Sequence, residues 1–477
     1  MQKKGIMPRL KMMMKKTAAF YLFSLLTIGL LLLPACGKKG GSTPPPTIIS
    51  NGSWTWMGGN DVPNIAGNYG TLGVAAPTNL PGPREFPAFA FGTSPTDPTG
   101  TFWLFGGSGL ASDGTPGYLN DLWKFDGTNW TWVAGSTAIN TPTNYGTQGV
   151  TAPTNDPGAR ESAASWTDAS GNFWLFGGLE VTNKVKGELN DLWKFDGTHW
   201  TWISGTNIIN AEGSFDAAGN ILPGAVPNAR YGAASWTDKN GIFWLFGGFG
   251  TSSGVGVHLN DLWKFDPTTA VWTWVSGGPT SAGGGYGPAP GTPTPGNIPG
   301  ARREAAGWAD ASGNQWIFGG FGLASSGTGY LNDLWKFDGT AWTWMAGGNV
   351  VNGGGVFGAP PAPAPGNTPS ARGAAAGWTD ASGNFWLFGG TGFGTGGVGL
   401  LNDLWKFDGT NWAWISGTNG TYMTDLYGTL GVAAPGNAPG GRSGAGAWAD
   451  PSGRLWLFGG FGLGNGLNND LWRYQPP

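Results

Sequence analysis

The sequence predicts an all-β protein built from repeated four-stranded antiparallel sheets, and two observations support this class. The first is a repeat: the segment LNDLWKFDGTNWTW at 119–132 returns almost letter for letter three times, and with changes twice more. Such a period indicates one structural unit copied along the chain. The second is composition, because 90 glycines and 35 prolines alternate with 29 tryptophans, as turns alternate with short aromatic strands. The repeated tryptophans of this segment are Trp123, Trp193, Trp263, Trp335, Trp405 and Trp472.

The second copy shows how one unit divides into strands. Residues 160–168 are mostly small and suit a crowded central strand, and a tight turn then leads into the apolar strand 173–176. After a looser loop, residues 191–196 place alternate side chains on opposite faces, and 200–203 form a fourth strand with both tryptophans on one face. Four antiparallel strands repeated in this way predict the blades of a β-propeller.

A glycine pair follows the second strand of each unit, an aromatic third strand comes next, and tryptophan lies in the fourth. These features resemble the kelch repeat, and the resemblance covers about residues 53–477. It implies a kelch-type propeller, similar in fold to the central domain of the galactose oxidases. The glycine pairs are 106–107, 177–178, 247–248, 319–320, 389–390 and 459–460.

The number of units and the two chain ends predict how the propeller closes. The last unit stops after its third strand, and SWTWMGG at 53–59 is the end of a unit without its beginning. We therefore expect a six-bladed propeller in which the N-terminal strand completes the last blade and leaves no sheet edge exposed. The six units begin at Arg84, Arg160, Arg230, Arg302, Arg372 and Arg442.

Residues 1–35 have the features of a targeting segment. Two lysines precede the apolar run 20–33, which has the length of a signal peptide and is short for a membrane-spanning helix. Leu-Pro-Ala-Cys at 33–36 resembles the lipobox of bacterial lipoproteins, which implies that Cys36 carries the lipid; a plain secretory signal is the alternative. The proline-rich residues 36–52 read as a flexible tether to the propeller. We expect an exported cell-envelope protein, anchored to a membrane by its N-terminal lipid.

Charge and residue counts limit the chemistry. Residues 1–35 hold six of the 25 Lys and Arg and none of the 28 Asp and Glu, so the mature chain carries a net charge near −9. That charge does not favour nucleic acid as a partner. Cys36 is the sole cysteine, and His199 and His258 fall in connections on opposite faces, so we expect no disulfide, metal or other cofactor. The kelch-like copper oxidases need a cysteine–tyrosine crosslink and histidine ligands that this chain lacks.

The six arginines are candidate ligand-binding residues. They open the innermost strand of each unit, so they can ring the mouth of the central channel and hold a carboxylate or sulfate. The alternative is that each arginine pairs with the aspartate that opens the third strand of its unit. Those aspartates are Asp121, Asp191, Asp261, Asp333, Asp403 and Asp470.

The residue after each arginine differs between units, and variation at an otherwise constant site is what a function would produce. Glu85, Glu161, Tyr231 and Arg303 are therefore further candidate ligand-binding residues, whereas Gly373 and Ser443 occupy the position in the last two units. Glu85 and Glu161 also form the one suggestive carboxyl pair for glycoside hydrolysis. Drift between repeats would give the same pattern.

An aromatic residue recurs in the long loop before each arginine. Six such rings can form a stacking platform for sugars or peptide side chains, or each ring can fix its own loop to the blade below. The loops between strands two and three and between strands four and one share one face, called here the long-loop face, where function is expected. The aromatic residues are Tyr69, Tyr145, Phe215, Tyr286, Phe357 and Tyr427.

These observations favour a non-catalytic, surface-anchored propeller that binds a protein, peptide or glycan through its long-loop face as a monomer. The alternatives are an exported carbohydrate-active enzyme, related in fold to sugar mutarotases or oxidases, and a purely structural envelope protein. An enzyme predicts a deep polar pocket at the channel mouth where Glu85, Glu161 or Arg303 converge and the symmetry is reduced. A binding module predicts a shallow aromatic face and a channel plugged by regular arginine–aspartate pairs. A structural protein predicts near-perfect symmetry and no pocket.

Overall fold

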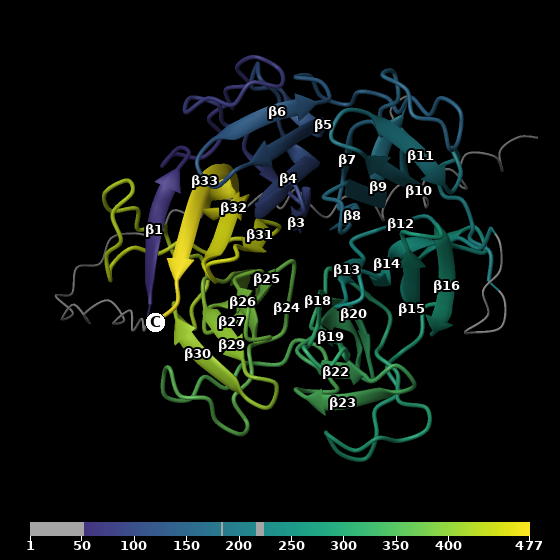
Figure 1. Cartoon of the computed structure of the whole chain (residues 1–477). Helices are drawn as coiled ribbons and strands as arrows, with labels where there is room; N and C mark the ends of the chain where they lie inside the picture. Colours follow the sequence, from purple (N-terminus) through teal and green to yellow (C-terminus); the bar gives the residue numbers. More distant parts are fainter. Residues whose placement is uncertain (1–51, 183–184, 216–223) are drawn as a thin grey trace, which may run out of the picture. The chain divides into compact units, whose positions relative to one another are not determined.

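The computed structural model describes residues 52–182, 185–215 and 224–477, and strands dominate them (Figure 1). One short 3₁₀ turn, η1 (Leu463–Asn465), is the sole helical element within these ranges. No helix in the described part of the chain is long and apolar enough to cross a membrane. The expected targeting segment 1–35 and tether 36–52 lie outside the described residues, apart from Gly52.

The first three repeats each form one sheet in which a long hairpin is flanked by shorter strands. Repeat one consists of β2 (Arg84–Glu85), β3 (Ala88–Ser94), β4 (Asp97–Leu110), β5 (Pro116–Phe125) and β6 (Trp130–Ala134). Repeat two consists of β7 (Arg160–Glu161), β8 (Ala164–Thr167), β9 (Phe173–Thr182), β10 (Val185–Phe195) and β11 (Trp200–Ser204). Repeat three consists of β12 (Arg230–Tyr231), β13 (Ala234–Thr237), β14 (Phe243–Ser252), β15 (Val255–Asp266) and β16 (Val271–Ser276).

The next two repeats have the same path, with the long hairpin divided into two sheets. Repeat four consists of β17 (Arg302–Arg303), β18 (Ala306–Ala309), β19 (Gln315–Phe318), β20 (Phe321–Ala324), β21 (Gly327–Tyr330), β22 (Leu334–Phe337) and β23 (Trp342–Ala346). Repeat five consists of β24 (Arg372–Gly373), β25 (Ala376–Thr379), β26 (Phe385–Phe388), β27 (Thr391–Gly394), β28 (Gly397–Leu400), β29 (Leu404–Phe407) and β30 (Trp412–Ser416).

The last sheet joins the two ends of the described chain. Its order is β1-β33-β32-β31, where β31 spans Gly446–Ala449, β32 spans Leu455–Gly462, β33 spans Gly466–Gln475 and β1 spans Ser53–Gly58. Strand β1 pairs antiparallel with β33, and Trp54 faces Tyr474 while Trp56 faces Trp472. The N-terminal strand therefore occupies the place that β6, β11, β16, β23 and β30 have in the other sheets.

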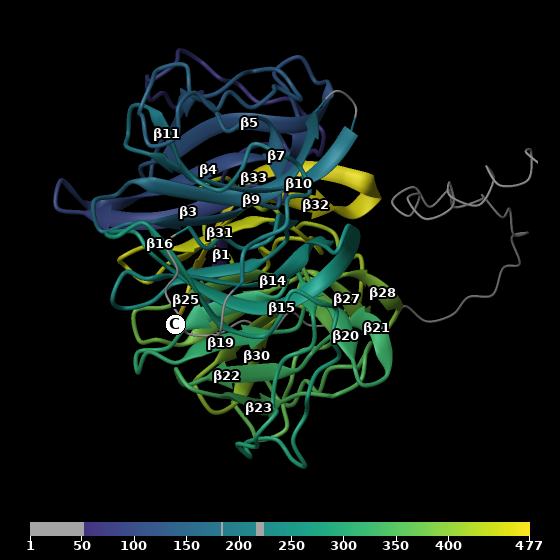
Figure 2. The ribbon, with the colours of Figure 1, turned by 90° about the vertical axis from the view of Figure 1, so that its right-hand side faces the viewer.

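The sheets surround a common axis, which makes the fold a β-propeller (Figure 1). Strands β3, β8, β13, β18, β25 and β31 lie innermost, and each contacts the next around the circle, including β31 with β3. Small residues line these inner strands, such as Ala164 and Ala234, because the strands converge at the axis. The long hairpins extend to one side of the molecule, where β20–β21 and β27–β28 lie together (Figure 2).

Aromatic side chains fill the interfaces between neighbouring sheets. Trp308 of repeat four stacks on Phe385 of repeat five with ring centroids 3.8 Å apart, and Phe102 of repeat one stacks on Trp448 of the last repeat at 3.6 Å. The core is thus a set of aromatic layers between sheets. Burial of large aromatic surfaces is the main stabilising term for such an arrangement.

Two local expectations differ from the structure. The innermost strand, expected as a continuous 160–168, is interrupted at Ser162, whose φ of 54° is left-handed and breaks the strand into β7 and β8. The connection expected as a looser loop between strands two and three is mostly paired, with Gly178 opposite Leu189 and Val185 opposite Thr182. A bulge beside the glycine pair shifts the register and allows the hairpin to continue beyond it.

Candidate functional site

Each of the six unit-opening arginines is buried against the aspartate that opens the third strand. In repeat four, Arg302 donates from Nη1 to Asp333 Oδ1 at 2.6 Å, from Nη2 to Asp333 Oδ2 at 2.7 Å, and from Nη1 to the Gly319 carbonyl at 2.9 Å. The arginine therefore ties the glycine pair to strand three. The same ion pair, at 2.6–2.7 Å, joins Arg84–Asp121, Arg160–Asp191, Arg230–Asp261, Arg302–Asp333, Arg372–Asp403 and Arg442–Asp470.

These buried pairs expose almost no surface or free hydrogen-bonding group to a ligand. Both side chains of the Arg302–Asp333 pair are fully shielded from solvent. Asp333 also accepts hydrogen bonds from Trp335 Nε1 and Tyr286 Oη, each at 2.7 Å. The structure thus shows the pairing that was the alternative to an arginine ring at the channel mouth, and the arginines lie inside their own repeats.

The six loop aromatics are held in the same way. Tyr286 lies 5.1 Å from the ring centroids of both Trp335 on β22 and Trp344 on β23. All six rings contact a tryptophan of strand three and one of strand four, with centroid distances of 4.9–5.4 Å; they are Tyr69, Tyr145, Phe215, Tyr286, Phe357 and Tyr427. Each ring thus anchors its loop to the sheet beneath, and a role in stacking on a ligand stays a prediction.

A circle of backbone hydrogen bonds surrounds the axis, and the sequence did not reveal it. The residue two positions after each arginine has a left-handed φ of 52–66°. Its N–H donates to the carbonyl of the equivalent residue in the preceding repeat at 2.7–3.0 Å, and repeat one donates to the last repeat. The six residues of this circle, called here the axial ring, are Phe86, Ser162, Gly232, Glu304, Ala374 and Gly444.

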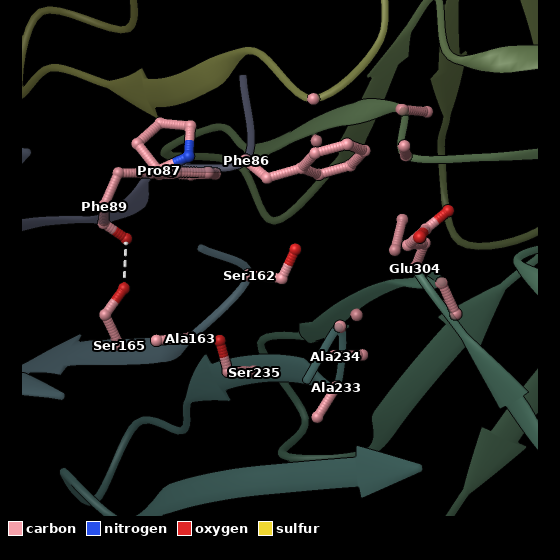
Figure 3. A pocket seen from close by; sticks show the side chains of 18 of the residues that line it. Phe86, Pro87, Phe89, Ser162, Ala163, Ser165, Ala233, Ala234, Ser235 and Glu304 are labelled. Carbon is pink, nitrogen blue, oxygen red and sulfur yellow. Dashed lines mark hydrogen bonds between the residues drawn. The ribbon is translucent and has the colours of Figure 1, made fainter. Parts of the chain in front are cut away.

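A cavity of about 210 Å³ lies on the axis beside the axial ring (Figure 3). Alanine and glycine make most of its wall, and Ser162, Ser165 and Ser235 add hydroxyls. Ser165 Oγ donates to the Phe89 carbonyl at 2.9 Å. Glu304 is the one ionisable residue among the described residues of this wall. The cavity is therefore small and mostly neutral, with a single titratable carboxyl group in its wall.

The side chains that differ between repeats converge at the end of the axis where the long hairpins lie. We call Glu85, Glu161, Tyr231, Arg303 and Glu304 the axial cluster. Arg303 Nε donates to Glu304 Oε1 at 3.1 Å, and its Nη1 lies 3.5 Å from Tyr231 Oη. The structure therefore brings together four residues that the sequence marked as candidates, and it adds Glu304.

Residues of the long hairpins enclose the axial cluster. The Arg303 guanidinium lies 5.1 Å from the ring centroid of Phe321 and 5.9 Å from that of Phe249, within cation–π range. On the other side, Tyr118 Oη donates to Glu161 Oε1 at 2.9 Å, and Lys186 Nζ lies 5.3 Å from the Tyr118 ring centroid. Gly373 and Ser443 occupy the equivalent positions in repeats five and six and add little bulk.

Burial and mutual repulsion shift the titration of the cluster. Burial, with the nearby charges of Glu161 and Glu304, raises the pKa of Glu85 to about 8. Burial also raises the pKa values of Glu161 and Glu304, against the opposing effects of Tyr118 and Arg303 respectively. Glu85 therefore holds its proton at neutral pH, and burial shifts the pKa values of Glu161 and Glu304 in the same direction.

Replacing Glu85 by glutamine is expected to stabilise the protein at high pH and to change little at low pH. Because its pKa is raised from 4.5 to about 8, the Glu85 carboxyl contributes stability below pH 4.5 that is lost as the pH rises through 8. We expect E85Q to gain about 1–2 kcal/mol over the wild type at pH 9 and nearly none at pH 5. Urea unfolding at both pH values measures this, and an equal effect at both would contradict it.

The sequence also led to expectations about metal binding and about the two histidines. The described residues contain no group of three or more His, Cys, Asp or Glu arranged to bind a metal ion. His258 lies within strand β15 and not in a loop, between the rings of Phe249 and Phe321. Burial, and then the charge of Arg303, lower the pKa of His258 to about 4, so this imidazole is neutral at physiological pH.

The fold and the site together define a β-propeller with a mixed-charge cluster on its axis. No family model matches the chain, and no curated protein matches its sequence. Among solved structures, it is similar to one titled "Structure of YjhT", with 15% sequence identity and a TM-score of 0.47. The match covers 82% of this chain and 95% of the other. A likeness of this strength identifies neither a ligand nor a reaction.

Proposed function

We propose that residues 53–477 form a closed, six-bladed kelch-type propeller that binds its ligand at the axial cluster without chemical change. In this proposal, residues 1–35 are a lipoprotein signal and the lipid on Cys36 anchors the mature protein to a membrane of the bacterial cell envelope. Pairing of β1 with β33 and the unbroken axial ring support the closed architecture. The glycine pairs and repeated tryptophans support the kelch assignment.

The convergence of unlike side chains at equivalent positions is the observation that carries the binding proposal. The position after the arginine is Glu85 in repeat one, Glu161 in repeat two, Tyr231 in repeat three and Arg303 in repeat four. The arginine–aspartate pairs and loop aromatics beneath are nearly the same in every repeat. The scaffold is thus symmetric, and its asymmetry is concentrated at the axis, where a single asymmetric ligand can contact several repeats.

The ligand class that fits is a protein segment, peptide or glycan that reaches the long-loop face. The half-buried Tyr231 offers ring surface for stacking, and the carboxyl groups of the cluster offer hydrogen bonds in either protonation state. The long hairpins on this side give such a ligand a wall to lie against (Figure 2).

The same convergence is also what a carbohydrate-active enzyme predicts, and one further observation favours that alternative. Glu85 and Glu161 occupy the same position in neighbouring repeats and have raised pKa values, as a general acid requires at neutral pH. Glycoside hydrolysis needs one protonated and one ionised carboxyl across the scissile bond. Burying ionisable side chains costs free energy, and a purely structural envelope protein gives no reason for that cost.

Binding to glycan and peptide arrays tests the proposal. The full chain, purified in detergent, is compared with a triple variant in which Glu85, Glu161 and Arg303 are replaced by alanine. A matched control is D196N, which removes one exposed charge from a turn between strands three and four and preserves its hydrogen bonding to Thr198. We expect binding by the wild type and D196N that is lost in the triple variant.

Two outcomes would change the assignment. Binding that survives in the triple variant would place the site away from the axial cluster, and no binding to either array would favour the structural alternative. Incubation of a bound glycan with the wild type, followed by NMR of the sugar, separates binding from catalysis. Product that forms with the wild type and not with E85Q would establish the enzyme.

A further inference from the structure

The charges around the axial cluster do not balance. Four carboxyl groups lie in or beside it, from Glu85, Glu161, Glu188 and Glu304. Two cations accompany them, from Lys186 and Arg303. With every group ionised, the site therefore carries two more negative than positive charges. A buried or half-buried site with excess charge is stabilised by a ligand of opposite sign.

Three of the four carboxyl groups already have a partner. Glu161 accepts the Tyr118 hydroxyl at 2.9 Å, Glu188 accepts the Thr251 hydroxyl at 3.3 Å, and Glu304 accepts from Arg303 Nε at 3.1 Å. Within the described part of the chain, no donor bonds the Glu85 carboxyl, and the charges that act on it are those of the like-charged Glu161 and Glu304. Glu85 is therefore the group whose ionised form lacks compensation.

The order of the repeats around the axis places the acidic and basic side chains on opposite sides of the site. In the axial ring, repeat one is followed by two, three and four, so Arg303 enters from the side opposite Glu85. Tyr231 of repeat three stands between the acidic side, formed by Glu85 and Glu161, and the Arg303 side. Gly373 and Ser443, both buried, occupy the remaining side and add no charge to it.

A protonated amine fits this arrangement better than a metal ion does. Metal ligands must converge within about 2–2.6 Å of one point, and the described carboxyl groups do not gather in that way. A primary ammonium group has three N–H donors on a flexible stem and can reach separate carboxyl groups at hydrogen-bond distance. The carbon body that carries it can then lie against the Tyr231 ring.

We infer that the ligand of the axial cluster carries a protonated primary amine, which Glu85 and Glu161 bind while Tyr231 contacts the adjoining part of the ligand. This inference rests on the proposed binding function and names its ligand class. The amine can belong to an amino sugar or to a lysine side chain of a peptide. Arg303, held by Glu304 and by the rings of Phe321 and Phe249, marks the opposite limit of the site.

Binding of an amine should release a proton. The Glu85 carboxyl is mostly protonated at pH 7, and an ammonium beside it favours the ionised form. The groups that face Glu85 are Glu161 and Glu304, with Tyr118 beyond Glu161, and none of them compensates its negative charge. Affinity for a permanently protonated amine is therefore expected to rise between pH 6 and pH 8.5.

Two matched pairs of probes test the inference by isothermal titration calorimetry on the full chain. Glucosamine is compared with N-acetylglucosamine, and Nα-acetyl-lysine amide with Nα,Nε-diacetyl-lysine amide; in each pair only the first probe carries an amine that can be protonated. We expect the charged member of at least one pair to bind at least about tenfold more tightly than its acetylated form. The pair that responds tells whether the amine comes from a sugar or a peptide.

Variants connect that preference to the site. E85Q is expected to lose at least about tenfold in amine affinity and to abolish proton release, measured in two buffers of different ionisation enthalpy, while D196N keeps both. Equal binding of both members of each pair, unchanged amine binding in E85Q, or no binding of either amine at millimolar concentration would overturn the inference. If array ligands without amines still need the axial cluster, the proposed function stands and the ligand class is wrong.

Discussion

Replacement of Asp333 by alanine is expected to lower the free energy of unfolding by about 3–5 kcal/mol. The substitution leaves the Arg302 guanidinium fully buried without its counter-charge. It also removes the acceptor of hydrogen bonds from Trp335 Nε1 and Tyr286 Oη. This carboxylate holds strand β22 and the long loop that carries Tyr286 directly, and it positions Arg302, which in turn bonds the Gly319 carbonyl. Urea unfolding monitored by tryptophan fluorescence measures the loss.

Two further variants separate the buried charge from the loss of side-chain volume. D333N keeps the shape of the side chain but not its charge, and we expect most of the destabilisation to remain because Arg302 is still uncompensated. D338A removes an aspartate from the exposed turn of the same repeat, where it caps two backbone amides, and should cost about 1 kcal/mol. A loss below 1 kcal/mol in both Asp333 variants would show that the pair contributes little to stability.

The contrast between these buried pairs and the axial cluster shows what the sequence could predict. Because the repeats align with one another, the arginine and the aspartate stand out as constant positions, and pairing within a repeat could be stated as one of two alternatives. The same alignment marked Glu85, Glu161, Tyr231 and Arg303 as positions that differ. What could not be read from the sequence is which constant residues are shielded and which variable residues meet.

The axial ring shows why Glu304 was missed. Its six members are Phe86, Ser162, Gly232, Glu304, Ala374 and Gly444, which share no side-chain property and therefore leave no pattern in the sequence. They share only a left-handed backbone, and bulky or charged residues rarely adopt it without a surrounding constraint. The constraint is the hydrogen bond between neighbouring repeats, a tertiary interaction. Local strain of this kind is often found where a binding site is assembled.

The loop aromatics show how far a regular spacing in the sequence can be interpreted. Their regular spacing predicted six rings on one face, which is compatible both with a platform for ligands and with anchors for loops. In the structure Tyr286 is enclosed by Trp335 and Trp344 and bonded to Asp333. A residue that recurs in every repeat is expected to have a structural role that every repeat shares, such as fixing the long loop. A ligand without sixfold symmetry is instead contacted by positions that differ between repeats.

Replacement of Trp54 by alanine is expected to destabilise the propeller by about 3–5 kcal/mol, although Trp54 lies far in sequence from its neighbours. The side chain is 3% exposed and packs against Tyr474 of its own sheet, at 5.1 Å, and Phe388 of the preceding repeat, at 5.5 Å. Thermal and urea unfolding of W54A measure the effect. The value tests whether the N-terminal strand closes the propeller in solution.

The repeat supplies the matched control for this test. Trp130 holds the same place in β6 as Trp54 does in β1, is 4% exposed, and packs against Phe125 of its sheet and Phe458 of the preceding repeat, both at 5.0 Å. If the N-terminal strand completes the last sheet, W54A and W130A should cost nearly the same. A loss below 1 kcal/mol for W54A alone would mean that β1 is detached. Removal of residues 53–58 would then leave stability unchanged, whereas in a closed propeller it exposes the edge of β33 and promotes self-association.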